Sequence, residues 1–202
     1  EVKADLVWAP SSTEEIYPSG FATQVVPGGP ATVGLEDAFR PHFFTGAATV
    51  VAKLLLQCLP DVAVFGEKDF QQLRVVERVA ADLDIPVRII GGRTVREADG
   101  LAMSSRNRYL TPDLRSRAAA LPRIMRAAID LIEAGGDVDA ALAGAKDELL
   151  RAGFNSVDYV QLADAESLAP LSHRSARPAR LLVAVRIGGT RLIDNMPVEA
   201  PS

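Results

Sequence analysis

The four residues from Gly66 to Asp69 combine a glycine, two carboxylates and a lysine directly after an apolar run. That run, Val62–Phe65, predicts a buried strand that Gly66 ends. Asp69 suits the N-cap of a following helix, and Gln72 three residues later completes a capping-box pattern. A helix N-terminus offers free N–H groups and a positive dipole to an anion, and Lys68 adds a flexible cation. This strand–loop–helix corner is therefore a candidate phosphate-binding site.

The residues after this corner predict an amphipathic helix, because Leu73, Val76, Ala80 and Leu83 recur at helical spacing. An ordinary polar loop followed by a capped helix would have the same composition, since capping signals are common at helix starts. The corner alone leaves both interpretations open.

A second segment, Arg96–Tyr109, is rich in small and hydroxyl residues and carries three arginines. Ser104, Ser105 and Arg106 together offer hydroxyls, backbone N–H groups and a guanidinium, which can surround a polyphosphate. Gly100 is a candidate hinge. The alternative is a solvated turn before the next helix, which an isolated Ser-Ser-Arg would favour.

Taken together, the two segments resemble the signature blocks of the pantothenate synthetase (pantoate–β-alanine ligase) family. The blocks are Phe65–Leu73 and Asp99–Leu110, and their order and separation match the family. The similarity extends through Arg40–Gly46, Pro86–Arg96 and Thr190–Asn195, and so covers nearly the whole chain. Two long blocks in register are far more specific than a single short motif.

This resemblance implies an ATP-dependent condensation of pantoate with β-alanine. A pantoyl adenylate would form first with release of pyrophosphate, and the β-alanine amine would then displace AMP to give pantothenate. Mg²⁺ is expected together with ATP, and a homodimer is expected as the assembly. Two alternatives remain open: a related nucleotidyltransferase without the amide-forming step, and a non-catalytic fragment or interaction module of the same fold.

The resemblance also assigns roles by matching position. Lys68 would lie on the ATP phosphates and stabilise the transition state, Gln72 would hydrogen-bond pantoate, and Arg40 would lie at the substrate pocket. Val95 would contact adenine through its backbone, and these residues do not identify a protein ligand for Mg²⁺. The remaining residues expected to bind ATP are Phe65, Gly66, Asp69, Met103, Ser104, Ser105 and Arg106, of which the last three are also expected to be catalytic with Lys68.

Two features differ from the family pattern. The family begins with a segment that carries a His-x-Gly-His-type motif, whereas the only histidines here are His42 and His173. We therefore expect these 202 residues to be a fragment or part of a longer chain, with incomplete catalytic groups on their own. The family's Arg-Pro-x-His-Phe-x-Gly segment is Arg40-Pro-His-Phe-Phe-Thr-Gly46 here, so no role transfers to His42. We expect His173 to be a surface residue.

Composition places limits on partners. The chain has 48% hydrophobic and 24% charged residues, as is ordinary for a globular protein. Its net charge of −4 argues against a nucleic-acid partner. No apolar run reaches membrane-spanning length, and no signal-peptide pattern opens the sequence. We expect a cytoplasmic protein in which the single cysteine, Cys58, is a buried small hydrophobe on the apolar face of a helix.

The predicted elements divide the chain into two parts. In residues 1–94 we expect strands at 5–10, 62–65 and 85–91, and helices at 47–59 and from Asp69 onward. In residues 95–202 we expect helices at 111–135 and 138–150, and strands at 157–162, 181–187 and 191–194 with a hairpin turn at Gly188-Gly189-Thr190. In residues 111–135 a helical stripe of leucine, methionine and alanine predicts core packing. The fold class is therefore α/β: a partial Rossmann-like nucleotidyltransferase domain with a parallel sheet, followed by a small α+β domain with an antiparallel sheet.

Overall fold

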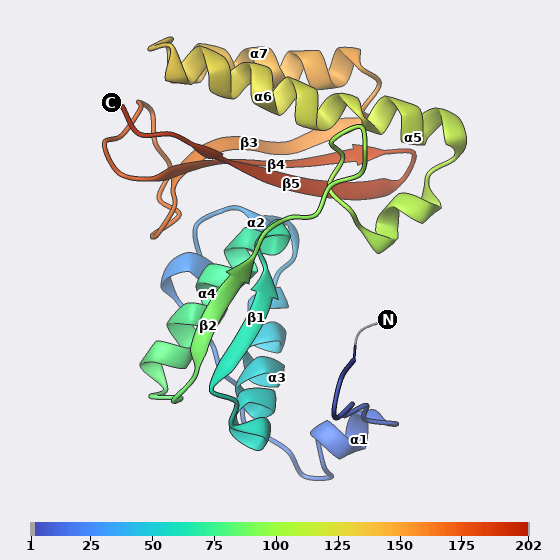
Figure 1. Ribbon diagram of the computed structural model, residues 1–202, viewed down its shortest axis with the longest axis vertical. Coiled ribbons are helices and arrows are strands. Elements are labelled where there is room, and N and C mark those ends of the chain that lie inside the picture. Colours follow the sequence, from blue (N-terminus) through green and yellow to red (C-terminus); the bar gives the residue numbers. More distant parts are fainter. Residues whose placement is uncertain (1–2, 202) are drawn as a thin grey trace.

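The computed structural model describes residues 3–201 and stacks two units on each other (Figure 1). The first unit has the parallel strands β1 (Val62–Gly66) and β2 (Arg88–Gly92), joined by helix α4 (Phe70–Asp82). The second has an antiparallel sheet in the order β3–β4–β5, with helices above it. This is the combination of parallel and antiparallel sheets that the sequence predicts. The boundary between residues 94 and 95 stays a prediction.

Helix α3 (Phe43–Cys58) packs beside α4, and the two helices cover one face of the β1–β2 pair. The opposite face is open among the described residues, and Val62, Val64 and Ile90 on it are 38%, 67% and 37% exposed. The prediction that this first strand is buried is therefore wrong for alternate residues. Side chains of a strand alternate between faces, and only one face has helices against it.

The chain before α3 has little regular structure. It contains only the short helices α1 (Thr13–Ile16), η1 (Gly29–Ala31) and α2 (Glu36–Phe39) within the described residues. The strand expected at 5–10 does not form, and Leu6 and Val7 there are 85% and 77% exposed. A strand requires a neighbour that pairs its backbone groups, and no described segment pairs with this one.

Helix α3 begins at Phe43, earlier than expected, after His42 in the left-handed region with φ of 66°. His42 is exposed, as is His173. Cys58 is also exposed, so the prediction that it is buried is wrong. It lies in the last turn of α3, where the neighbouring residues from Leu56 to Leu59 are exposed as well. The apolar face of the helix therefore packs only along its earlier turns.

The helical layer of the second unit consists of α5 (Pro112–Ala118), α6 (Ala120–Glu133) and α7 (Val138–Arg151). The single helix predicted at 111–135 is interrupted after Ala118. Pro122 has no N–H to donate to the carbonyl of Ala118, and this missing bond accounts for the break. The predicted stripe is nonetheless core: Leu121, Met125 and Ile132 are almost fully buried against the sheet.

The sheet consists of β3 (Ser156–Asp164), β4 (Ala179–Ile187) and β5 (Thr190–Val198). The hairpin between β4 and β5 turns at Gly188 and Gly189, with φ of 53° and 82°, as the sequence predicts. All three strands are longer than expected, because cross-strand pairing continues past the apolar runs. Within residues 3–201 no helix has both the length and the apolar character needed to cross a bilayer.

Asp164, at the end of β3, holds the turn that follows. Its Oδ1 accepts hydrogen bonds from the N–H groups of Glu166 and Ser167 at 3.1 and 2.8 Å, and from the Ser167 hydroxyl at 2.9 Å. The backbone N–H of Ser167 contributes most to lowering the pKa of this carboxyl, against the opposing effect of burial. The folded state therefore favours the carboxylate.

The Asp164→Asn variant should be less stable than the wild type, by an amount that depends on pH. Because the folded pKa lies below the unfolded value of about 3.9, the charged form stabilises the fold above that pH. This contribution is lost as pH falls through the folded pKa. Urea unfolding at several pH values should give a constant difference in the free energy of unfolding above about pH 5 that shrinks below about pH 4. A difference that did not change with pH would show that the charge contributes nothing.

Candidate active site

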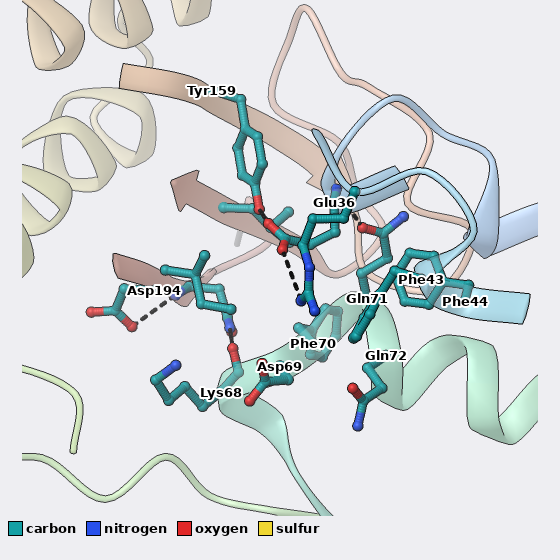
Figure 2. A pocket seen from close by; sticks show the side chains of 14 residues that line it. Glu36, Phe43, Phe44, Lys68, Asp69, Phe70, Gln71, Gln72, Tyr159 and Asp194 are labelled. Carbon is teal, nitrogen blue, oxygen red and sulfur yellow. Dashed lines mark hydrogen bonds and ion pairs between the residues drawn. The ribbon is translucent and has the colours of Figure 1, made fainter. Parts of the chain in front are cut away.

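The strand–loop–helix corner at Gly66–Asp69, which the sequence predicts to bind phosphate and which is called here the phosphate corner, forms at the carboxyl end of β1. The residues Glu67–Asp69 make one turn of 3-10 helix, η2, and α4 begins at Phe70. Asp69 occupies the N-cap position, but its side chain makes no capping hydrogen bond, so the capping-box prediction is wrong. The η2 turn leads directly into α4, and the side chains of Asp69 and Gln72 instead line a pocket with Lys68 (Figure 2).

Two adjacent pockets meet at this corner. The first, called here the Gln72 pocket, has a polar lining from Glu36, Arg40, Lys68, Asp69, Gln71, Gln72, Tyr159, Asp194 and Asn195. The second, called the Ser104 pocket, has a polar lining from Lys68, Ser104, Arg106, Asn107, Arg191 and Asp194. Lys68 and Asp194 belong to both linings. The structure thus brings the two predicted segments together, with Lys68 where the pockets adjoin.

Arg40 supplies a second cation to the Gln72 pocket. Its guanidinium carbon lies 3.5 Å from the centre of the Phe43 ring, and its Nη1 lies 3.9 Å from Glu36 Oε2. The side chain is 37% exposed. A stacked, partly hydrated guanidinium at the edge of a pocket can bind a carboxylate through two parallel hydrogen bonds, in a bidentate arrangement.

The segment after β2 forms a loop closed at its base. The Met103 N–H donates to the Val95 carbonyl at 2.9 Å, and Arg96 and Ala102 form a β-bridge. The helix η3 (Ser105–Tyr109) follows, with Ser104 at its N-cap accepting from the Arg106 N–H at 3.2 Å. Ser105 and Arg106 are exposed. The loop therefore presents its hydroxyls and guanidinium on a fixed base.

Arg115 on α5 fixes the outer side of this loop. It donates to Asp99 Oδ2 and Glu97 Oε2, each at 2.6 Å, and Asn107 Nδ2 donates to Glu97 Oε1 at 2.8 Å. Hydrogen bonds from Arg115 are the largest cause of the lowered pKa of both carboxyls. Both acids therefore stay ionised and hold the loop from outside the pockets.

Four of the predicted site residues do not place their side chains in either pocket: Ser105 on the loop, and Phe65, Val95 and Met103. Phe65 packs into the core beside Ile89, so only its backbone faces the corner. Val95 and Met103 are 65% and 54% exposed and lie at the base of the loop, outside both linings. Any contact of Val95 with a nucleotide through its backbone stays a prediction.

A buried ion cluster that the sequence did not predict joins the two units beside the Gln72 pocket. Glu36, which is 7% exposed, accepts from the Tyr159 hydroxyl at 2.8 Å and from both terminal nitrogens of Arg191 at 2.7 and 2.8 Å. Arg191 Nε donates to Asp158 at 2.7 Å. Burial, and then the charge of Glu36, raise the pKa of the Tyr159 hydroxyl. The hydroxyl therefore stays protonated and donates.

Other side chains tie β4 and β5 to the phosphate corner and the loop. Asn195 Nδ2 donates to the carbonyls of Glu67 and Lys68, and Arg180 lies 3.1 Å from Glu67. Arg96 makes paired hydrogen bonds to Asp194 at 2.7 and 2.9 Å. No local pattern marked these contacts, because their partners are about 100 or more positions apart in the sequence. The resemblance at Thr190–Asn195 was the one available signal.

The sequence model of the family described as pantoate–β-alanine ligase matches residues 1–197 of this chain. The chain belongs to that family. This chain is 55% identical over 196 residues to the pantothenate synthetase of Bradyrhizobium sp. (strain BTAi1), with 97% of this chain and 69% of that protein covered. It is 56% identical over 194 residues to the pantothenate synthetase of Rhodopseudomonas palustris (strain HaA2), with 96% and 68% covered.

Solved structures agree with this assignment. The pantothenate synthetase from Thermus thermophilus superposes on this chain with a TM-score of 0.86 and 48% identity, covering 94% of this chain and 68% of that one. The pantoate–β-alanine ligase from Francisella tularensis, in complex with β,γ-ATP and β-alanine, gives a TM-score of 0.72 at 31% identity, covering 94% and 64%. The chain thus spans about two thirds of the length of these relatives.

The Glu36→Gln variant tests the energetic weight of the buried cluster. Neutralising Glu36 leaves Arg191 with Asp158 alone in a buried site, and removing one partner of such a pair is strongly destabilising. We expect the free energy of unfolding to fall by about 2–4 kcal/mol in denaturant titration.

The matched control for Glu36→Gln is Asp82→Asn. Asp82 pairs with Arg78 on the surface of α4, and the two side chains are 49% and 63% exposed. A surface pair of this kind contributes under about 1 kcal/mol. An equal decrease in the free energy of unfolding in the two variants would show that the buried cluster contributes no more to stability than a surface ion pair.

Proposed function

We propose that the chain carries out ATP-dependent condensation of pantoate with β-alanine through a pantoyl adenylate, giving pantothenate, AMP and pyrophosphate. Membership of the family makes it a ligase that forms a carbon–nitrogen bond. The observation that supports the adenylate route is the place of Lys68 between the Gln72 pocket and the Ser104 pocket. One pocket then suits a hydroxy acid, and the other suits a polyphosphate.

In the first step, a carboxylate oxygen of pantoate attacks the α-phosphorus of ATP, and pyrophosphate leaves with the electron pair of the broken P–O bond. In the second, the β-alanine amine attacks the acyl carbon, and AMP leaves with the oxygen that came from pantoate. The amine loses one proton as the amide forms. The protein must bring two anions together in line, so fixed positive groups and exclusion of water supply most of the catalysis.

The residues divide between the two substrates. Lys68 neutralises the charge that develops on the phosphates as pyrophosphate departs. Ser104, Ser105 and Arg106 bind phosphate oxygens from the loop, and the exposure of Ser105 and Arg106 leaves these two free to contact a nucleotide. Gln72 suits the carboxylate and hydroxyls of pantoate, because its amide both donates and accepts.

The remaining assignments rest on the family resemblance. Arg40 contacts the substrate from the edge of the Gln72 pocket, and Asp69 and Gly66 contact the ribose hydroxyls. Phe65, Val95 and Met103 contribute backbone contacts or enclose the nucleotide. A homodimer and a cytoplasmic location belong to the same proposal.

Mg²⁺ is expected with the nucleotide. Residues 3–201 contain no group of three histidine, cysteine or acidic side chains arranged to hold a metal ion. This set of side chains does not fit a metal cage built from protein alone. It is compatible with Mg²⁺ bound through substrate phosphates and water, as is usual for this ion.

An isotope experiment distinguishes the adenylate route from its alternatives. Pantoate labelled with ¹⁸O in its carboxylate is incubated with ATP, β-alanine and the full-length enzyme that contains this chain. The adenylate route predicts AMP that carries one ¹⁸O atom. Formation of ADP would exclude the route, and pyrophosphate release without any response to β-alanine would indicate a nucleotidyltransferase. Failure to bind ATP at all would indicate an interaction module.

The Lys68→Ala variant should lose most of its rate of adenylate formation. Removing a preorganised charge from a phosphoryl-transfer site costs on the order of 10²-fold or more in kcat. The fold should be unaffected, because a single loop charge contributes little stability. The assay is pyrophosphate release with pantoate and ATP.

Lys146→Ala is the matched control for Lys68→Ala. Lys146 is an exposed lysine on α7, in the helical layer above the sheet. The control should retain full rate. Unchanged turnover in Lys68→Ala would remove this lysine from the mechanism.

A further inference from the structure

Two consecutive residues of β5, Asp194 and Asn195, are almost fully buried at 2% and 4% exposure. Both are paired with β4, opposite Val183 and Leu182. Successive side chains of a strand point to opposite faces, so the two residues reach different segments. Asp194 shares a face with the core residues Leu192 and Met196, and Asn195 points toward the phosphate corner.

Asn195 binds the backbone of the phosphate corner directly. Its Nδ2 donates to the carbonyl oxygen of Glu67 at 3.0 Å and to that of Lys68 at 2.9 Å. Both partners can only accept, so the nitrogen must face them. The two bonds fix the peptide planes on each side of the Lys68 α-carbon, and hence the direction in which its side chain leaves the backbone.

The other atom of the Asn195 amide has no partner. Its Oδ1 is buried without a hydrogen bond among the described residues. A buried acceptor left unpaired is destabilising, and a buried polar group in this state requires an explanation. The two bonds to the backbone at Lys68 are therefore the only hydrogen bonds of the Asn195 side chain among the described residues.

Asp194 holds the base of the Ser104–Arg106 loop. Its carboxylate accepts the paired hydrogen bonds of Arg96, which also donates to the carbonyl of Gly100 at 3.0 Å. The Asn195 N–H donates to Asp194 Oδ1 at 2.7 Å. One dipeptide on a paired strand therefore contacts both the base of the Ser104–Arg106 loop and the backbone at Lys68.

We propose that Asn195 is a positioning residue that aims Lys68 at the nucleotide phosphates, opposite the loop that Asp194 anchors. The role rests on the proposed function, because the group being aimed is the cation of the ATP site. Asn195 also lines the Gln72 pocket, but the role proposed here is exerted through the backbone of Lys68. Because β5 belongs to the second unit, the orientation of the Lys68 side chain then depends on the contact between the two units (Figure 1).

A double-mutant cycle tests this role with ATP as the probe. The dissociation constant for ATP is measured by calorimetry for the full-length enzyme, for Asn195→Ala, for Lys68→Ala and for the double variant. With Lys68 present, Asn195→Ala should weaken ATP binding roughly 10-fold; in the Lys68→Ala background the same change should have an effect under about 2-fold. Independent, multiplicative effects of the two substitutions would overturn the proposal.

Asn195→Asp separates hydrogen bonding from volume. Aspartate has the size of asparagine but offers only acceptors to the two carbonyls, so it should weaken ATP binding at least as much as alanine does. Binding at wild-type affinity would show that the side chain only fills space, and would overturn the proposal.

Asn155→Ala is the control for a lost side-chain hydrogen bond to backbone. Asn155, just before β3, accepts through Oδ1 from the N–H of Gly188 in the β4–β5 turn at 2.7 Å. This variant should leave ATP binding unchanged. Pyrophosphate release is followed in parallel. ATP binding without turnover would refute the proposed function while the cycle still tests Asn195, and turnover with a multiplicative cycle would refute only the positioning role.

Discussion

The burial of the Glu36 carboxylate is the constraint on which the arrangement of the two units depends. A charge removed from water is stable only with close partners, and Glu36 finds them in Tyr159 and Arg191 of the second unit. Gln71 completes the arrangement by accepting from the Glu36 N–H at 2.8 Å and donating to the carbonyl of Pro30. Separating the units would remove Tyr159 and Arg191 from the Glu36 carboxylate.

This cluster also explains why the pockets have polar walls from distant parts of the chain. The Gln72 pocket lies between α4 and β5, where the first unit meets the sheet of the second. Arg180 of β4 lies against Glu67 and over the Phe70 ring, 4.0 Å from its centre, and burial lowers the pKa of its guanidinium while Glu67 opposes that effect. The start of α4 is therefore enclosed by charged groups held in place by the sheet.

The open face of the β1–β2 pair contrasts with the closed contact between the units. Val62, Val64 and Ile90 lie on it as neighbouring, partly exposed apolar side chains. The helices that cover the other face supply a core of their own, so the corner at Gly66 has support from α3 and α4 as well as from β5. The phosphate corner is thus fixed from two sides by independent sets of contacts.

The sequence by itself determined the strand–loop–helix corner, the Ser104–Arg106 loop, the hairpin at Gly188 and the family. These are local patterns, in which a turn residue, a helical period or a contiguous block carries its own physical meaning. Predictions from the sequence were wrong where packing outweighed a local pattern. These cases are the burial expected of Cys58, the capping box of Asp69 and the strand expected in residues 5–10. Propensity gives no information on whether a neighbour is present to bury a face or pair a strand.

Only the tertiary structure decided which residues surround Lys68. Glu36, Asp194 and Asn195 are polar residues whose sequence neighbourhoods do not distinguish a solvated side chain from a buried one. Asp194 and Asn195 become part of the site because folding places β5 beside the start of α4, more than 120 positions away in the chain. Hydrogen bonds and ion pairs depend on distance in space and on loss of water, and neither quantity is encoded in the spacing of residues along a sequence.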